Sequence, residues 1–439
     1  MGFDIDGLLT RYLTEGIAAN KKNHVGLELE FPILRVRGGP IDMEVIRGLF
    51  PVLAGIGFDR QSFAGELPLK ALDGQGNAVT FDTCYAVLEY VTTSAPDMVR
   101  LYRRFYQALE AVQGYLRAHG HMLCGLGFNP TEGAPLAPKV PADLTLAIGQ
   151  VLAHGYAGAR AKYLDFYVRI ASEQIHFNTT PQELPTLMRM LTYADLANML
   201  LFSNSPARLG GLDYLCMRHR LYRSSRLNAL GMTGAQPLWA RSLEDYVREY
   251  RKICMFSRHR DGQRQVFQPV PFEDYFSDPA YEAREEDIWD FDIERNVVTT
   301  RYGTVEYRTL CAQSFGEAFM PSAFTLGLRE RLDDALALCQ NFYQAHGMQD
   351  ANQLLDRAAL SGDVAGVDEA ELEGWLRALL ELSLEGLKAR GWGEEAFLAP
   401  LLARSRMLDC PARRFVRTAR RDGLAQALEQ RAEVSPALL

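Results

Sequence analysis

Apolar side chains recur along this chain with two different periods. Short segments that alternate apolar and polar residues predict strands with one covered face at 25–31, 79–92, 172–179 and 303–310. Apolar residues that recur every three to four positions predict amphipathic helices at 98–116, 185–201, 321–338 and 363–393. Because strands and helices do not alternate regularly, we expect an α+β fold with a mainly antiparallel sheet.

The first strand segment carries two acidic residues two positions apart. Glu28 and Glu30 therefore share one face of the strand, and two neighbouring anions repel unless a cation neutralises them. Carboxylate oxygen is also the ligand that Mg²⁺ prefers. Since alternating Glu and apolar residues are equally typical of a half-exposed edge strand, this pair alone leaves both interpretations open.

The second segment places acidic residues beside an apolar stretch. Asp82 and Glu89 flank Val87 and Leu88, and Tyr90 and Val91 follow Glu89. A carboxylate among such residues costs several kcal/mol to desolvate unless it is paired or bound to a metal. Glu89 thus predicts a polar cavity beside the strand, unless its side chain simply alternates toward solvent.

The remaining two segments add nitrogen ligands and a cation. Gln174, His176 and Asn178 share one face of their strand, which favours a ligand surface over the usual role of a lone histidine as a structural residue. Glu306 and Arg308 also share a face, and an ordinary ion pair is an equally good interpretation of these two.

Taken together, the four segments supply more negative charge than one cavity can hold without cations. The expected metal ligands are Glu28, Glu30, Asp82, Glu89, His176 and Glu306. Carboxylates beside one arginine suit nucleotide phosphates bridged by Mg²⁺, with Arg308 at the phosphoryl group that is transferred. The sequence contains no glycine-rich phosphate loop that would offer another way to bind a nucleotide.

Composition excludes several other classes of protein. The 439 residues are 48% hydrophobic and carry a formal net charge of −8, which argues against nucleic acid as the main partner. No apolar run approaches the roughly 20 residues of a membrane helix, and the first residues lack the basic region of a signal peptide, so we expect no membrane partner and a cytoplasmic location. The seven cysteines show no Cys-x-x-Cys spacing, which favours reduced thiols.

In order along the chain, short blocks of sequence resemble the glutamate–cysteine ligases of the glutamine synthetase superfamily. Residues 25–30 resemble the family's Ile-Gly-x-Glu-x-Glu, residues 175–178 its Val-His-Tyr-Asn, and residues 305–310 its Ile-Glu-x-Arg-Ser-Leu. Further blocks with such a likeness are 79–92, 201–207 and 224–232.

The resemblance implies a glutamine synthetase-like twisted, mainly antiparallel sheet that forms a funnel, with helices outside. Residues 1–345 would form the catalytic domain, and residues 346–439 a helical C-terminal extension packed on it. The family uses ATP and Mg²⁺, with Mn²⁺ able to substitute, to activate an amino acid carboxylate as an acyl phosphate and to form an amide with an amine.

The resemblance also implies roles for individual residues. The six predicted ligands would hold the metals, and Arg308 would act as the catalytic residue and contact the nucleotide. Asn178, Arg226 and Met232 fall at positions that bind substrates in the family. The expected partners are small amino acid and amine substrates, and the oligomeric state is left open.

Two departures from the family concern the acceptor amine. Met232 and Ala229 stand where relatives have Tyr and Asp, and a thioether cannot donate a hydrogen bond. The acceptor, cysteine or another amino compound, is therefore open. The alternatives outside the ligase class are a guanidino kinase-like phosphotransferase of the same superfamily and a non-catalytic nucleotide binder.

Overall fold

The computed structural model describes residues 2–131, 137–153, 168–364 and 366–434. A nine-stranded sheet lies at its centre, in the order β14-β15-β7-β1-β5-β4-β3-β2, with β6 joined to β1. Each of these pairings is antiparallel, which confirms the predicted sheet type. The strands are β1 (Val25–Arg35), β2 (Arg60–Ala64), β3 (Leu67–Leu72), β4 (Ala78–Phe81), β5 (Val87–Val91), β6 (His121–Leu123), β7 (Ser172–Phe177), β14 (Val297–Thr299) and β15 (Val305–Cys311).

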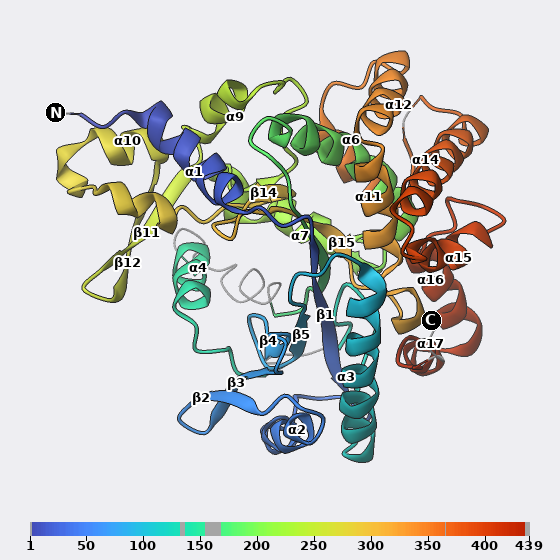
Figure 1. Cartoon of the computed structure of the whole chain (residues 1–439). Helices are drawn as coiled ribbons and strands as arrows, with labels where there is room; N and C mark the ends of the chain where they lie inside the picture. Colours follow the sequence, from blue (N-terminus) through green and yellow to red (C-terminus); the bar gives the residue numbers. More distant parts are fainter. Residues whose placement is uncertain (1, 132–136, 154–167, 365, 435–439) are drawn as a thin grey trace.

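Helices surround this sheet, and three short two-stranded ribbons lie outside it (Figure 1). The helices are α1 (Ile5–Ala19), α2 (Met43–Gly55), α3 (Met98–Ala118), α4 (Asp143–Ala153), α6 (Leu184–Phe202), α7 (Met217–Ser224), α8 (Arg226–Ala229), α9 (Leu243–Tyr250), α10 (Phe272–Ser277), α11 (Met320–Glu330), α12 (Leu332–Ala345), α13 (Ala351–Ser361), α14 (Glu369–Arg390), α15 (Ala399–Leu402), α16 (Pro411–Asp422) and α17 (Leu424–Arg431). The ribbons pair β8 (Ala207–Leu209) with β9 (Leu212–Tyr214), β10 (Thr233–Gly234) with β13 (Glu294–Arg295), and β11 (Cys254–Arg260) with β12 (Gln263–Pro271).

Two of the predicted helices match the structure closely. Helix α3 begins after Asp97, whose carboxylate accepts a hydrogen bond from the backbone N–H of Arg100 at 2.8 Å. Helix α6 covers the predicted segment 185–201 and has Pro185 in its first turn, where a missing N–H costs nothing. The apolar period was a sufficient guide here because each helix packs one continuous face.

Three predicted elements are divided differently in the structure. Segment 321–338 forms α11 and α12 with a break at Arg331, because α11 packs on α14 whereas α12 packs on α6. Segment 79–92 is a hairpin of β4 and β5, so Asp82 lies in the connection and not on a strand. In segment 363–393 the helix begins only after Asp368, which caps it through the N–H of Ala370, and it ends at Gly391 as predicted.

The two faces of the central sheet differ in chemistry. Phe31 of β1 stacks on Phe105 of α3 with ring centroids 5.8 Å apart, and Tyr307 of β15 accepts a hydrogen bond from Asn198 of α6 at 2.9 Å. Helices therefore cover the apolar face. Glu28, Glu30 and their neighbours are left on the opposite face, which confirms the predicted alternation of β1.

The C-terminal helices pack against the rest of the chain through α6, α7 and α11. Several arginines of α16 are already paired, for example Arg414 with Glu317 at 2.8 Å and Arg417 with Asp409 at 2.6 Å, so this basic stretch is a stabilising face. The domain boundary at residue 345 and the funnel shape of the sheet stay predictions. Within the described residues, no helix is long and apolar enough to span a membrane.

Candidate active site

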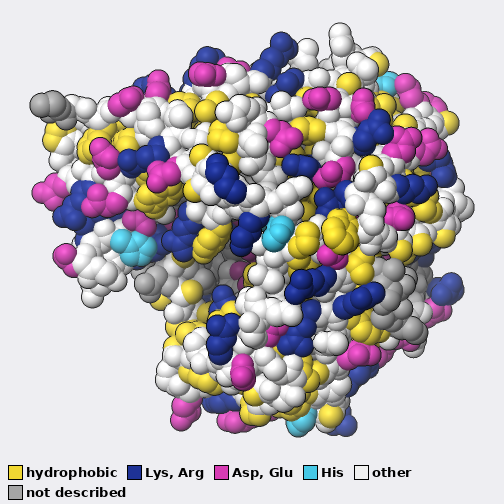
Figure 2. All heavy atoms as spheres, viewed as in Figure 1, with side chains coloured by type: hydrophobic (Ala, Val, Ile, Leu, Met, Phe, Trp, Pro, Cys, Tyr) yellow, Lys and Arg dark blue, Asp and Glu magenta, His cyan; other side chains and the backbone are white. Residues whose placement is uncertain are grey.

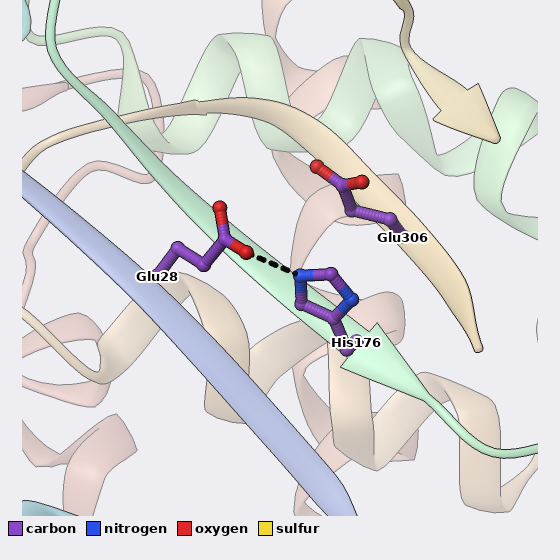
Figure 3. A group of neighbouring side chains, drawn as sticks. All are labelled: Glu28, His176 and Glu306. Carbon is purple, nitrogen blue, oxygen red and sulfur yellow. Dashed lines mark hydrogen bonds and ion pairs between the residues drawn. The ribbon is translucent and has the colours of Figure 1, made fainter. Parts of the chain in front are cut away.

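Strand register brings three predicted metal ligands together. His176 of β7 lies opposite Gly26 of β1 on one side and opposite Glu306 of β15 on the other. Glu28 is two residues further along β1 on the same face. One ligand atom from each of Glu28, His176 and Glu306 lies within 4.8 Å of the others, and the three side chains converge from three adjacent strands (Figure 3).

The imidazole of His176 is held from both sides. Its Nε2 lies 3.2 Å from a carboxylate oxygen of Glu28, and its Nδ1 lies 3.0 Å from the hydroxyl of Thr304. Thr304 follows Gly303, which has φ +79° and packs so closely on the backbone of Gly16 that a side chain would collide there. This glycine turn positions Thr304 and so directs Nε2 toward the carboxylates.

Burial and charge act in opposite directions on this pair. Burial lowers the pKa of His176, but the hydrogen bond and charge of Glu28 outweigh it, so the pKa is raised. Burial likewise raises the pKa of Glu28, yet His176 and Arg308 bring it below its ordinary value. Glu28 is therefore a carboxylate anion ready to bind a cation.

Glu30 is buried among hydrogen-bond donors. Its carboxylate accepts from the N–H of Ser172 at 2.7 Å, from the Ser172 hydroxyl at 2.8 Å and from the Gln174 amide at 2.8 Å. Burial nevertheless raises its pKa, against the charge of Arg218 and these hydrogen bonds. Gln174 is thus a support for Glu30 on the predicted shared face.

Glu89 and Asp82 complete the predicted set. Glu89 of β5 lies opposite Glu30 in the sheet, and burial together with the charges of Glu28 and Asp82 raises the pKa of Glu89 well above its ordinary value. The pKa of Asp82 is raised in the same way, by burial first and then by Glu30 and Glu294. Burial and mutual repulsion raise the pKa of both carboxyls, and a divalent cation bound among them would relieve that repulsion.

Arg308 lies at the edge of this carboxylate group. The Arg308 guanidinium pairs with Glu306 and lies 3.2 Å from Glu294. Burial alone would lower the pKa of Arg308, but the negative charges of these two carboxylates raise it. Along β15, Arg308 bonds to Glu306 on one face while Thr309 and Tyr307 both bond to Asp195 on the other, as strand alternation requires. The predicted same-face relation of Glu306 and Arg308 is confirmed.

Sequence reasoning missed three charged residues of this site. Glu294 of β13 pairs with Arg308, and the spacing Asp292-Ile293-Glu294 is the same alternation that identified Glu28 and Glu30. The buried Arg218 donates to the carbonyl of Arg308 at 2.7 Å, and Lys70 of β3 lies beside Glu89. Arg218 and Lys70 lie in segments with no polar pattern that distinguishes them from surface residues.

A cavity of about 580 Å³ opens beside the carboxylates. It is lined by Glu28, Glu89, His176, Asn178, Lys70 and Thr304, among others. Asn178 is 6% exposed, its side-chain Oδ1 accepts from the N–H of His24 at 3.0 Å, and its Nδ2 has no partner within the described part of the chain. A buried amide that offers an unused donor to a cavity is a candidate ligand contact, in agreement with the predicted role of Asn178.

The other two predicted substrate residues, Arg226 and Met232, are not among the described residues that line this cavity. Arg226 opens α8 and donates to the carbonyl of Val151, near the end of α4, at 2.8 Å. Met232 is fully buried in the hydrophobic core, and its assignment to a substrate pocket stays a prediction. The apolar replacement of the family's tyrosine is therefore accommodated by packing, since a thioether fills a core gap well.

Comparison with known proteins identifies the class. Residues 24–430 match the family model described as glutamate-cysteine ligase family 2 (GCS2). The chain belongs to this family, and it is a carboxylate–amine ligase. The prediction of an ATP-dependent amide ligase is confirmed at the level of the family. Among curated proteins, no sequence matches the chain.

Solved structures share the fold at low sequence identity. Glutamate–cysteine ligase of Francisella tularensis, solved in complex with AMP, is 14% identical with a TM-score of 0.52, and the match covers 94% of this chain and 88% of that one. A bifunctional glutathione synthetase of Pasteurella multocida is 12% identical with a TM-score of 0.52, and the match covers 98% of this chain and 53% of that one. The chain thus spans about half the length of the Pasteurella protein.

Proposed function

We propose that this protein uses ATP and Mg²⁺ to activate an amino acid carboxylate, the γ-carboxylate of glutamate, as an acyl phosphate, and then joins it to an amine. The observation that carries the proposal is the convergence of Glu28, His176 and Glu306 beside Arg308 at a cavity. The Francisella ligase, which was solved with AMP, has the same fold and supports nucleotide use.

The donor set suits magnesium. Oxygen ligands outnumber nitrogen ligands and no thiol is among them, as expected for a hard divalent cation, and Mn²⁺ fits the same ligands. Glu28, Glu30, Asp82, Glu89, His176 and Glu306 would hold the metals. When bound, these metals neutralise the phosphate oxygens and orient the γ-phosphoryl group.

The surrounding residues have complementary tasks in the first half-reaction. The cavity offers Lys70 and the free amide of Asn178 as donors to an anionic ligand. Basic side chains also gather around the hollow in the middle of the face in Figure 2, which favours a polyanion. The Arg308 guanidinium stabilises charge on the phosphoryl group as the substrate carboxylate oxygen attacks phosphorus and ADP leaves.

In the second half-reaction the amine nitrogen attacks the carbonyl carbon of the acyl phosphate. The C–N bond forms as the bond from carbon to the phosphate oxygen breaks, phosphate leaves with that electron pair, and the nitrogen releases a proton to solvent. The protein must keep water away from the acyl phosphate until the amine arrives.

The test is a matrix of acids and amines with ATP and Mg²⁺, read by ADP release and product mass. Hydroxylamine is added in a parallel series, because it traps an acyl phosphate as a hydroxamate without needing a specific acceptor. We expect hydroxamate with L-glutamate and an amide with the correct amine. A stable phosphorylated substrate without amide would indicate a kinase, and nucleotide binding without ADP release would indicate a non-catalytic binder.

A further inference from the structure

A second cavity, of about 430 Å³, lies between β10, the loop that follows it and the start of α13. Thr233 of β10 lines it and is 5% exposed, and its hydroxyl has no hydrogen-bond partner among the residues that the structure describes. Burial of a hydroxyl without a hydrogen-bond partner is unfavourable, so its position at a cavity points to a ligand that accepts or donates the missing bond. Neither the metal ligands nor the first cavity use this residue.

The second cavity adjoins the carboxylate group. Thr233 is the register partner of Glu294, whose carboxylate lies 3.2 Å from the Arg308 guanidinium. Arg223 lines both this cavity and a small opening of about 20 Å³, which Gly234, Glu294 and Arg308 also line. A molecule at Arg223 can therefore face Arg308 at one end and extend into the larger cavity at the other.

The lining is mainly polar, with Arg223 and Arg295 beside Glu249 and Asp350, and it includes a smaller apolar surface. The Arg223 guanidinium bonds to Asp356 through Nε at 3.3 Å and to Asn228 through Nη1, and its Nη2 makes no hydrogen bond with a described residue. Trp239 is 47% exposed at the far side, next to Leu238. A free donor on a held guanidinium suits a carboxylate. The Arg248 guanidinium lies over the Trp239 ring, 5.8 Å from its centroid, and the remaining exposed surface of the indole suits an apolar or aromatic group.

The C-terminal segment forms one wall of this cavity. Asn352, in the first turn of α13, accepts a hydrogen bond from the N–H of Ala235 at 2.9 Å, and its side chain packs on Gly234 so closely that a Cβ there would collide. Gly234 has φ +97°, so this contact also requires glycine. The wall is therefore built to a fixed shape and is not a loose surface groove.

We propose that this cavity holds the amine acceptor, and that the acceptor is an amino acid with an apolar or aromatic side chain. Its carboxylate binds Arg223, its amine points through the small opening toward Arg308, and its side chain lies against Trp239. This inference rests on the proposed ligase function and names the substrate class of its second half-reaction. It also explains how the acceptor is selected although Met232 is buried.

The experiment compares acceptors in the presence of L-glutamate, ATP and Mg²⁺, with hydroxylamine trapping as the measure of the first half-reaction. L-phenylalanine is expected to give amide with kcat/KM at least about tenfold above that of L-cysteine, and phenethylamine, which lacks the carboxylate, is expected to be poor. In Trp239→Ala and Thr233→Val the ratio of phenylalanine amide to hydroxamate should fall about tenfold, through KM for L-phenylalanine.

The matched control is Trp392→Ala, since Trp392 is 51% exposed in a separate groove beside α3. Its ratio should equal that of the unchanged protein. Hydroxamate formation without any phenylalanine amide, or equal ratios in Trp239→Ala and Trp392→Ala, would overturn the acceptor proposal while the ligase function stands. Absence of both ADP release and hydroxamate would instead refute the proposed function itself.

Discussion

Glu306→Gln is the most informative single substitution in the metal group. It keeps the shape of the side chain and removes one of the two carboxylates that meet at His176. Arg308 keeps its second partner, Glu294, at 3.2 Å, so the substitution leaves no buried arginine without a counter-charge. The fold should therefore persist while the affinity for Mg²⁺ falls.

The size of the effect follows from linkage between metal binding and folding. A metal at 100 times its dissociation constant stabilises the native state by about 2.7 kcal/mol. Mutation of a residue that only supports a metal ligand lowers metal affinity by up to about 100-fold, so removal of the ligand itself should weaken binding at least about 100-fold. The same Mg²⁺ concentration then stabilises the native state by only about 0.4 kcal/mol. With 439 residues at about 2.1 cal/mol/K each, the unfolding entropy is about 0.9 kcal/mol/K. The Mg²⁺-induced rise in Tm should therefore drop from about 3 °C to about 0.4 °C.

The assay is differential scanning calorimetry over a Mg²⁺ titration, with Glu66→Gln as the control. Glu66 is exposed in the turn between β2 and β3, outside the carboxylate group. The control should retain the full rise in Tm, and turnover should be lost only in Glu306→Gln. If Glu306→Gln keeps both the rise in Tm and near-normal turnover at saturating Mg²⁺, Glu306 is no metal ligand and the assignment is wrong.

Three further outcomes are expected. Arg308→Lys should lower kcat by about 10²–10³-fold with little change in KM for ATP, because a guanidinium assigned to the transferring phosphoryl group acts mainly in the transition state. Steady-state kinetics that show weaker ATP binding with unchanged kcat would contradict this role. Glu394→Ala should destabilise the protein by about 3–5 kcal/mol, which lowers Tm by about 3–5 °C. The reason is that the fully buried Glu394 pairs with Arg390 at 2.5 Å and accepts a hydrogen bond from the N–H of Met98 at 2.8 Å. In the same calorimetric scan, the control Glu381→Ala, at an exposed position, should leave Tm unchanged. The Cys216 thiol lies 3.5 Å from the Cys311 sulfur and lowers the pKa of Cys311 by donating a hydrogen bond to it. Cys216→Ala should therefore remove the ultraviolet absorbance of the Cys311 thiolate at neutral pH. An unchanged pH titration of this absorbance would refute the contact.

The sequence by itself determined the strands of the site and the side chains that they present. Alternation in β1, β7 and β15 fixes which residues share a face, because successive strand side chains point to opposite sides. Glu28, His176 and Glu306 were predicted as ligands on this basis, and the structure brings them together. The helices α3 and α6 were likewise evident, since one apolar stripe packs on one neighbour.

Tertiary structure decided what depends on contacts distant in sequence. The break at Arg331 follows from α11 and α12 packing on different partners, which no local period records. Glu294 joined the site only because β13 lies beside Arg308, and only the packing shows that the side chain of Met232 is completely buried.

The second cavity was also decided by tertiary structure alone. Thr233 and Asn352 are more than a hundred residues apart, and only the packing of α13 on β10 and its loop places them around one space. Alternation in the sequence specifies on which face of a strand each side chain lies. The space between that face and a neighbouring helix is set by how the helix packs in the folded protein. The side chains proposed as metal ligands were therefore predictable from the sequence, whereas the shape of the second cavity was not.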